Sequence, residues 1–155
     1  MKLFIIKSII ILFLVITPFS IRSSNNENEK QDEYLGYINI PKINLKQDLY
    51  TFTSPKNDIS KNVAIRKTSI KNTYLIMAHS GTGKLAYFNN LIYLEKGDII
   101  YLKINNDLKK YMVDNIYRAK KNGHIKIKNK ENMLILTTCD KLFKGYQLII
   151  ECNIE

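Results

Sequence analysis

The run LILTTCD, residues 134–140, is a short apolar and β-branched segment that ends in a cysteine. Segments of this length and composition are typical of buried β-strands. Five further segments share the pattern, with Gly, Asn and Lys clusters between them: residues 37–43, 73–78, 98–104, 110–119 and 147–153. Several short strands separated by turn residues predict an all-β domain, with the sheet closed into a barrel or packed as a sandwich.

Two local signals modify this all-β pattern. Pro41 interrupts the first segment, and a proline within a strand pattern indicates an edge strand or a bulge. Residues 85–94 are the one helical candidate, because Leu85, Phe88 and Leu91 recur at intervals of three residues.

The chain has 155 residues, which is enough for one domain with a substantial core. Its formal net charge is +10, and the lysines are scattered among Asn and Asp rather than gathered in one block. Solvated faces explain such lysines better than a nucleic-acid surface does, so we expect no nucleic-acid partner. Two isolated histidines and two cysteines without metal-ligand spacing predict neither a transition-metal site nor a cofactor.

The N-terminus has the pattern of an exported protein. Residues 1–22 begin with Lys2 and Lys7 and continue into an apolar stretch, as signal peptides and membrane anchors do. Since no clear cleavage site follows, we favour a single-pass anchor over a cleaved signal, with the rest of the chain outside the cell membrane. Residues 23–35 are polar and aperiodic and predict a flexible stalk before a domain at 36–155.

A histidine and a cysteine occupy similar places in this predicted sheet. His79 follows the apolar run at residues 73–78, and Cys139 ends the run at residues 134–138. Two neighbouring strand ends can bring such side chains to one rim. A free thiol is mostly protonated near neutral pH, and a nearby imidazole can take its proton or stabilise the thiolate. The pair is therefore a candidate catalytic centre.

Four segments in this order resemble the sortases, which are cysteine transpeptidases anchored in the membrane of Gram-positive bacteria. They are GYINIPKI (36–43), AHSG (78–81), LEKGDII (94–100) and LTTC (136–139). The resemblance implies a closed β-barrel of about eight strands with one or two short helices. It also implies Cys139 as nucleophile, His79 as its catalytic partner, and Thr138 and Ser80 as substrate-binding residues.

The same resemblance implies a substrate and an acceptor. Sortases cleave an LPXTG-like sorting signal at its Thr–Gly bond through a thioester with the cysteine. They then transfer the acyl group to an amino nucleophile of a cell-wall peptidoglycan precursor or a pilin. Surface proteins or pilins that carry sorting signals are therefore the expected partners.

One position departs from the family pattern. Sortases carry an arginine on the strand after the cysteine, and Gln147 stands at the matching place here. Its amide can donate a hydrogen bond, although without the charge that strengthens such bonds. Lys141 or Lys144 could alternatively supply that charge.

Other interpretations of these residues remain. Cys152 could form a disulfide with Cys139, although its alternation with Leu148 and Ile150 favours a place in the core. His124 lies among turn and charged residues and is expected in an exposed loop. Two further functions fit the same residues: a membrane-tethered binding module without catalytic activity, and a peptide hydrolase.

Overall fold

The computed structural model describes residues 33–155. The predicted anchor at residues 1–22 and nearly all of the predicted stalk lie outside the described residues. The first strand begins at Tyr34, two residues before the predicted start of the domain, and Leu35 is already buried. Within residues 33–155, no helix combines the length and apolar character needed to cross a bilayer.

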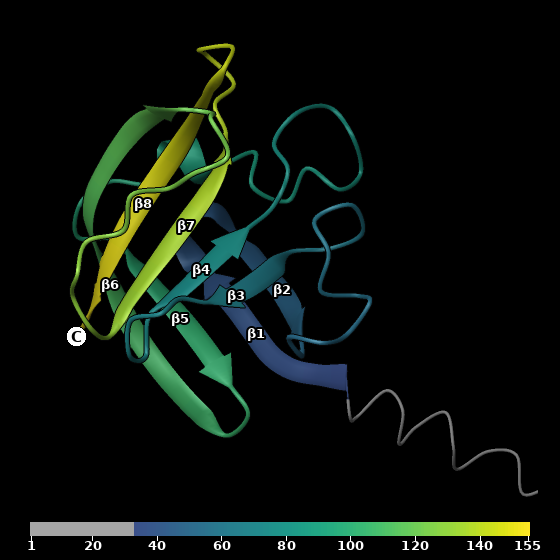
Figure 1. Cartoon of the computed structure of the whole chain (residues 1–155), viewed down its shortest axis with the longest axis vertical. Coiled ribbons are helices and arrows are strands. Elements are labelled where there is room, and N and C mark those ends of the chain that lie inside the picture. The colour runs from purple at the N-terminus through teal and green to yellow at the C-terminus, as the bar shows by residue number, and fades with distance from the viewer. Residues whose placement is uncertain (1–32) are drawn as a thin grey trace, which may run out of the picture.

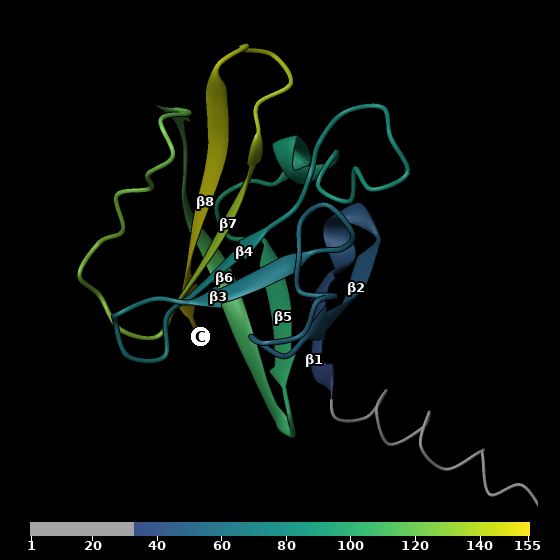
Figure 2. The same ribbon diagram turned by 45° about the vertical axis from the view of Figure 1, so that its right-hand side comes forward.

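Within residues 33–155, eight strands form one sheet, which confirms the all-β prediction (Figure 1). In chain order they are β1 Tyr34–Ile40, β2 Leu45–Tyr50, β3 Ala64–Lys67, β4 Tyr74–Met77, β5 Ile99–Ile104, β6 Asp107–Lys120, β7 Met133–Cys139 and β8 Tyr146–Ile154. Their order in the sheet is β2-β1-β5-β6-β8-β7-β4-β3. The sheet curls until its two edge strands, β2 and β3, approach each other, so the barrel is nearly closed (Figures 1 and 2).

The inner face of the barrel forms one apolar core, since alternate residues of each strand point inward. On β8 these residues are Leu148, Ile150 and Cys152, as the alternation predicts. Gly36 allows β1 to approach β5 closely, because a Cβ atom at this position would collide with the carbonyl of Lys103.

The predicted helix at residues 85–94 is wrong: this segment contains only turns and the 3-10 helix η2, Leu91–Tyr93. Phe88 and Leu91 are buried, so their periodicity does mark core positions. The backbone is held in a loop because the Phe88 N–H donates to the His79 carbonyl at 3.0 Å. The Asn89 amide also bonds both backbone groups of Gly81, and these contacts replace helical hydrogen bonds.

Pro41 marks neither an edge strand nor a bulge. It ends β1 and opens the 3-10 helix η1, Pro41–Ile43, while β1 lies between β2 and β5 inside the sheet. Proline is well suited to the first turn of a helix because its missing N–H would be unpaired there. The sequence pattern also missed β2 and β3, whose charged and polar residues hide the alternation.

Candidate active site

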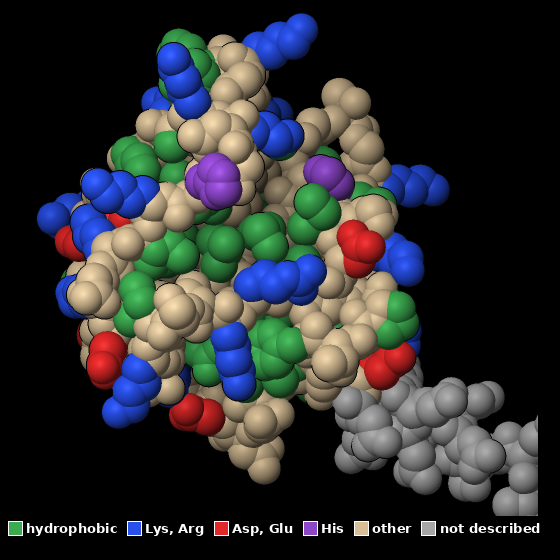
Figure 3. Space-filling model, viewed as in Figure 1, with side chains coloured by type: hydrophobic (Ala, Val, Ile, Leu, Met, Phe, Trp, Pro, Cys, Tyr) green, Lys and Arg blue, Asp and Glu red, His purple; other side chains and the backbone are tan. Residues whose placement is uncertain are grey.

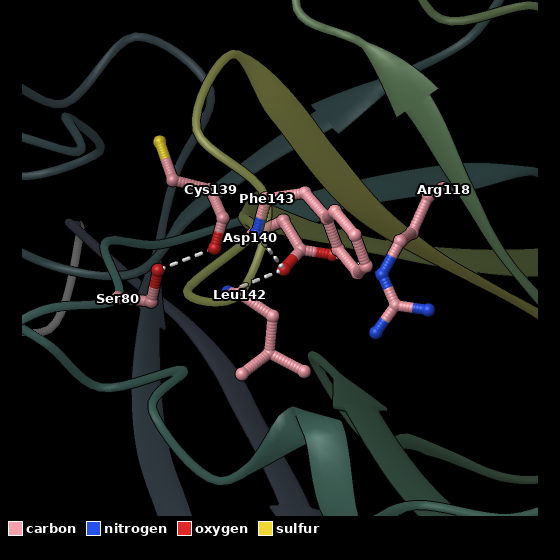
Figure 4. A network of polar contacts seen from close by, with 6 residues as sticks. All are labelled: Ser80, Arg118, Cys139, Asp140, Leu142 and Phe143. Atoms are coloured by element: carbon pink, nitrogen blue, oxygen red, sulfur yellow. Dashed lines mark hydrogen bonds and ion pairs between the residues drawn. The ribbon is translucent and has the colours of Figure 1, made fainter.

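The ends of β4 and β7 place the predicted histidine and cysteine at the same edge of the sheet. These strands are parallel neighbours, with Met77 opposite Thr137, so the residues that follow each strand emerge side by side. The Thr138 hydroxyl donates to the Ala78 carbonyl at 2.8 Å. The Ser80 hydroxyl donates to the Cys139 carbonyl, and the sulfur of Cys139 points away from Ser80 (Figure 4). Both hydroxyls therefore tie the two strand ends together.

These bonds involve the two predicted substrate-binding residues, Thr138 and Ser80. Thr138 is buried and Ser80 is half-buried, and each hydroxyl donates its proton to a backbone carbonyl of the protein itself. Their direct role toward substrate stays a prediction.

A groove of about 440 Å³ opens beside the thiol on the outer face of β4, β7 and β8. Both His79 and Cys139 line it, in agreement with the prediction that they share one end of the barrel. On this face apolar side chains gather between two histidines (Figure 3). The apolar residues of the groove wall are Ile59, Leu75, Met77, Ala78, Ile125 and Ile127. Such a surface suits an extended peptide with apolar side chains.

The segment between β6 and β7, residues 121–132, covers part of the sheet next to this groove. Lys128 forms a 2.6 Å ion pair with the buried carboxylate of Glu151, which also accepts from Asn115 and Tyr117. Burial and the Glu151 charge together raise the pKa of Tyr117, which keeps its hydroxyl protonated as a donor. This segment forms one wall of the groove through Lys121, Gly123, Ile125 and Ile127.

Gln147 lies opposite Cys139 in the β7–β8 ladder and also lines the groove, as alternation along β8 predicts. Its Nε2 atom donates to the His124 carbonyl at 3.3 Å, so one amide hydrogen anchors the 121–132 segment. His124 itself is exposed, as predicted. A primary amide has two hydrogens, so one remains for a ligand.

A lysine that the sequence did not single out contacts the thiol. The Nζ atom of Lys121 lies 3.2 Å from the Sγ atom of Cys139. Neither Lys141 nor Lys144, the two lysines considered from the sequence, forms a hydrogen bond or ion pair with Cys139 in the described structure. Lys121 is one of many scattered lysines, and only the pairing of β6, β8 and β7 reveals its position.

Asp140 fixes the chain directly after the cysteine (Figure 4). Its carboxylate accepts from the backbone N–H groups of Leu142, at 2.7 Å, and Phe143, at 3.1 Å, and forms an ion pair with Arg118. Burial alone raises the pKa of this carboxyl, but these hydrogen bonds outweigh burial and lower it. Arg118, which also stacks over Phe143, is therefore engaged away from the sulfur.

The two cysteines occupy different environments. Both are free thiols, so Cys139 and Cys152 do not form a disulfide. Cys139 is half-buried at the groove, whereas Cys152 is fully buried in the core. Burial raises the pKa of the Cys152 thiol, with smaller contributions from Asp114 and Glu151. Within residues 33–155, no cluster of three or more His, Cys, Asp or Glu side chains could hold a metal ion.

Comparison with known proteins identifies the class to which this fold and site belong. The model of the sortase domain family matches residues 38–154, so the chain belongs to the sortase family.

Two sortase A enzymes are similar in sequence. The chain is 27% identical to sortase A of Staphylococcus aureus over 112 residues, which are 68% of this chain and 54% of that protein. It is 26% identical to sortase A of Bacillus anthracis over 93 residues, which are 59% of this chain and 44% of that protein. The chain thus spans about half the length of these relatives.

Solved structures of sortases share the fold. Sortase C1 of Streptococcus suis superposes with a TM-score of 0.68 at 24% identity, covering 84% of this chain and 77% of that one. Sortase C of Clostridium perfringens, solved with the C-terminal cell wall sorting motif, gives a TM-score of 0.66 at 26% identity, covering 80% and 71%. The predicted sortase-like barrel is confirmed.

Proposed function

We propose that this sortase is a cysteine transpeptidase that cleaves an LPXTG-like sorting signal at the Thr–Gly bond. The acyl group passes to an amino nucleophile of a peptidoglycan precursor or a pilin. The observation that carries the proposal is the placement of Cys139 and His79 along one groove in a sortase fold. The sorting motif present in the Clostridium perfringens structure supports this class of substrate.

In the first half of the reaction, His79 takes the proton of the Cys139 thiol. The thiolate then attacks the threonine carbonyl carbon, forming a C–S bond and a negatively charged oxygen. When the C–N bond breaks, the imidazolium of His79 gives its proton to the departing glycine amine. A thioester to Cys139 remains.

The second half reverses these roles. An acceptor amine attacks the thioester carbonyl, the C–S bond breaks, and Cys139 leaves as a thiolate. The proton lost by the amine passes to His79, and the imidazolium then returns it to the Cys139 thiolate, which restores the starting thiol and neutral imidazole. In this mechanism the free amide hydrogen of Gln147, which lies opposite Cys139, donates to the transient oxyanion as a neutral donor.

The basic and apolar sequence pattern of residues 1–22 supports a location at the cell membrane. We propose that residues 1–22 anchor the protein as a single-pass segment and that the barrel acts outside the cell membrane. A location outside the membrane gives the barrel access to sorting signals and to cell-wall acceptors.

The decisive experiment incubates the full chain, in detergent micelles, with a library of sorting-signal peptides, with and without an amine acceptor such as triglycine. Joined peptide–triglycine products support a transpeptidase, whereas cleavage without joining indicates a hydrolase. Peptide binding without cleavage indicates a non-catalytic binding module and contradicts the proposal. The His79→Ala variant should cleave on the order of 10²- to 10⁴-fold more slowly, because the leaving amine loses its acid.

A further inference from the structure

We propose that Lys121 is a further catalytic residue, whose ammonium group stabilises Cys139 as the reactive thiolate. The role deepens the proposed function and rests on it for the identity of the substrate. The effect of Lys121 on the thiol is independent of the proposed function, because the reactivity of the thiol can be measured without any peptide.

The contact is direct and has a defined direction. Lys121 Nζ lies 3.2 Å from Cys139 Sγ, within hydrogen-bonding range for sulfur. An ammonium has three donors and no acceptor, so the lysine donates and the sulfur accepts. A thiolate accepts such a bond far better than a thiol, because the bond is then assisted by both charges. The contact therefore favours the form of Cys139 that attacks a carbonyl.

The backbone places Lys121 next to the cysteine through three adjacent strands. Ala119 pairs with Gln147 across β6 and β8, and Gln147 in turn pairs with Cys139 across β8 and β7. Lys121 lies two residues beyond Ala119, and its N–H donates to the Gly145 carbonyl at 2.8 Å. Its main chain is therefore fixed at the end of this ladder, and the long side chain needs only to reach back along the groove.

The charge of Lys121 is available to the thiol. Within residues 33–155, no carboxylate forms an ion pair with this lysine. The titratable groups around Cys139 are His79 after β4, Lys121 after β6, and Asp140 and Lys141 after β7. The carboxylate of Asp140 is already bonded to Arg118 and to backbone N–H groups. The surroundings of the sulfur are thus cationic or neutral toward it.

Lys121 keeps all of its protons throughout the reaction. The thiol proton passes to His79 and then to the departing amine, while the ammonium stays beside the sulfur. A neighbouring cation stabilises the negative charge of a thiolate, which favours that form over the thiol. Gln147 is uncharged, so among residues 33–155 the positive charge within hydrogen-bonding distance of the sulfur is that of Lys121.

The test measures the rate of Cys139 alkylation by iodoacetamide as a function of pH in the full chain in detergent micelles. Peptide mapping assigns the label to Cys139. The variants are Lys121→Gln, which removes the charge, and Lys121→Arg, which keeps it. Lys120→Gln is the matched control, because Lys120 is the adjacent exposed lysine.

We expect Lys121→Gln to move the midpoint of the alkylation profile upward by about one pH unit, a tenfold loss of thiolate below that midpoint. Lys121→Arg and Lys120→Gln should keep the wild-type midpoint. An unchanged midpoint in Lys121→Gln, or an equal shift in Lys120→Gln, overturns the assignment. If the midpoint shifts and no sorting peptide is cleaved, the proposed function fails while the role of Lys121 toward the thiol stands.

Discussion

The two faces of β7 and β8 carry one cysteine each, and the two thiols are in opposite environments. Cys152 lies on the inner face among Leu148, Ile150 and other core residues, and its burial raises its pKa. Cys139 lies on the outer face at the end of its strand, with Lys121 as a hydrogen-bond donor and His79 along the same groove. The same side chain thus serves as a small apolar residue on one face and as a candidate nucleophile on the other.

The strongest test of this contrast exchanges each cysteine for alanine. Cys139→Ala should abolish covalent labelling by a thiol-reactive sorting-signal analogue and lower peptide cleavage on the order of 10⁴-fold or more, because the attacking atom is lost. Cys152→Ala should keep labelling and lower only stability, because it leaves a small cavity in the core. Mass spectrometry of the labelled chain checks both variants. Labelling that survives in Cys139→Ala would contradict the assignment of the nucleophile.

Gln147 tests whether the outer face needs a donor opposite the nucleophile. Gln147→Ala should lower the rate of peptide cleavage about a hundredfold or more, because it removes the donor to the oxyanion. Gln147→Arg should raise the rate, because a charged donor forms a stronger bond. Single-turnover cleavage of a sorting-signal peptide measures both effects. Rates that stay unchanged in both variants would show that Gln147 serves only as the anchor of the His124 carbonyl.

The sequence predicted the inner face better than the outer one. Apolar alternation on β8 placed Leu148, Ile150 and Cys152 in the core, and the strand pattern located six of the strands. Inner positions are predictable because burial selects apolar residues at every second position. The strand pattern missed β2 and β3. The apolar residues of β2 are separated by charged and polar ones, and β3 has only four residues.

The candidate site shows the same limit. His79 and Cys139 could be selected because each ends a recognisable apolar run, and the resemblance to sortases connects them. Lys121 could not be selected in this way, because its contact with the thiol depends on the register of three strands. Local sequence patterns do not contain that register. The false helix at residues 85–94 has a related cause, since side-chain bonds from Asn89 fix a loop that periodicity alone cannot anticipate.

Asp140 provides a smaller test of how the end of β7 is held beside the groove. The lowered pKa of its carboxyl means that its ionised form stabilises the fold above the unfolded-state pKa of about 3.9, and this contribution is lost as pH falls through the folded-state value. Asp140→Asn should therefore lower the free energy of unfolding by about 1–3 kcal/mol at pH 7. The difference should shrink in acid.

Urea unfolding of both proteins at pH 7 and at pH 3 measures this effect. Arg118→Gln is the control, because it removes the ion pair and keeps the two backbone hydrogen bonds to the carboxylate. Its loss of stability should be smaller than that of Asp140→Asn. A constant difference between wild type and Asp140→Asn across this pH range would contradict the role of the ionised carboxylate.

The smallest expected effect separates two adjacent threonines on opposite faces of β7. Thr138 donates to the Ala78 carbonyl, whereas the buried Thr137 hydroxyl has no hydrogen-bond partner among residues 33–155. Thr138→Val should therefore lower the free energy of unfolding by about 1–2 kcal/mol, because a hydrogen bond between the two strand ends is lost and a buried carbonyl loses its donor. Thr137→Val, which has nearly the same shape, should be neutral or slightly stabilising, because it removes a hydroxyl that is buried without compensation. Urea unfolding at pH 7 compares the two variants directly. Equal losses would mean that the Thr137 hydroxyl is bonded in solution, and the outer face of β7 would then be as tightly held as the inner one.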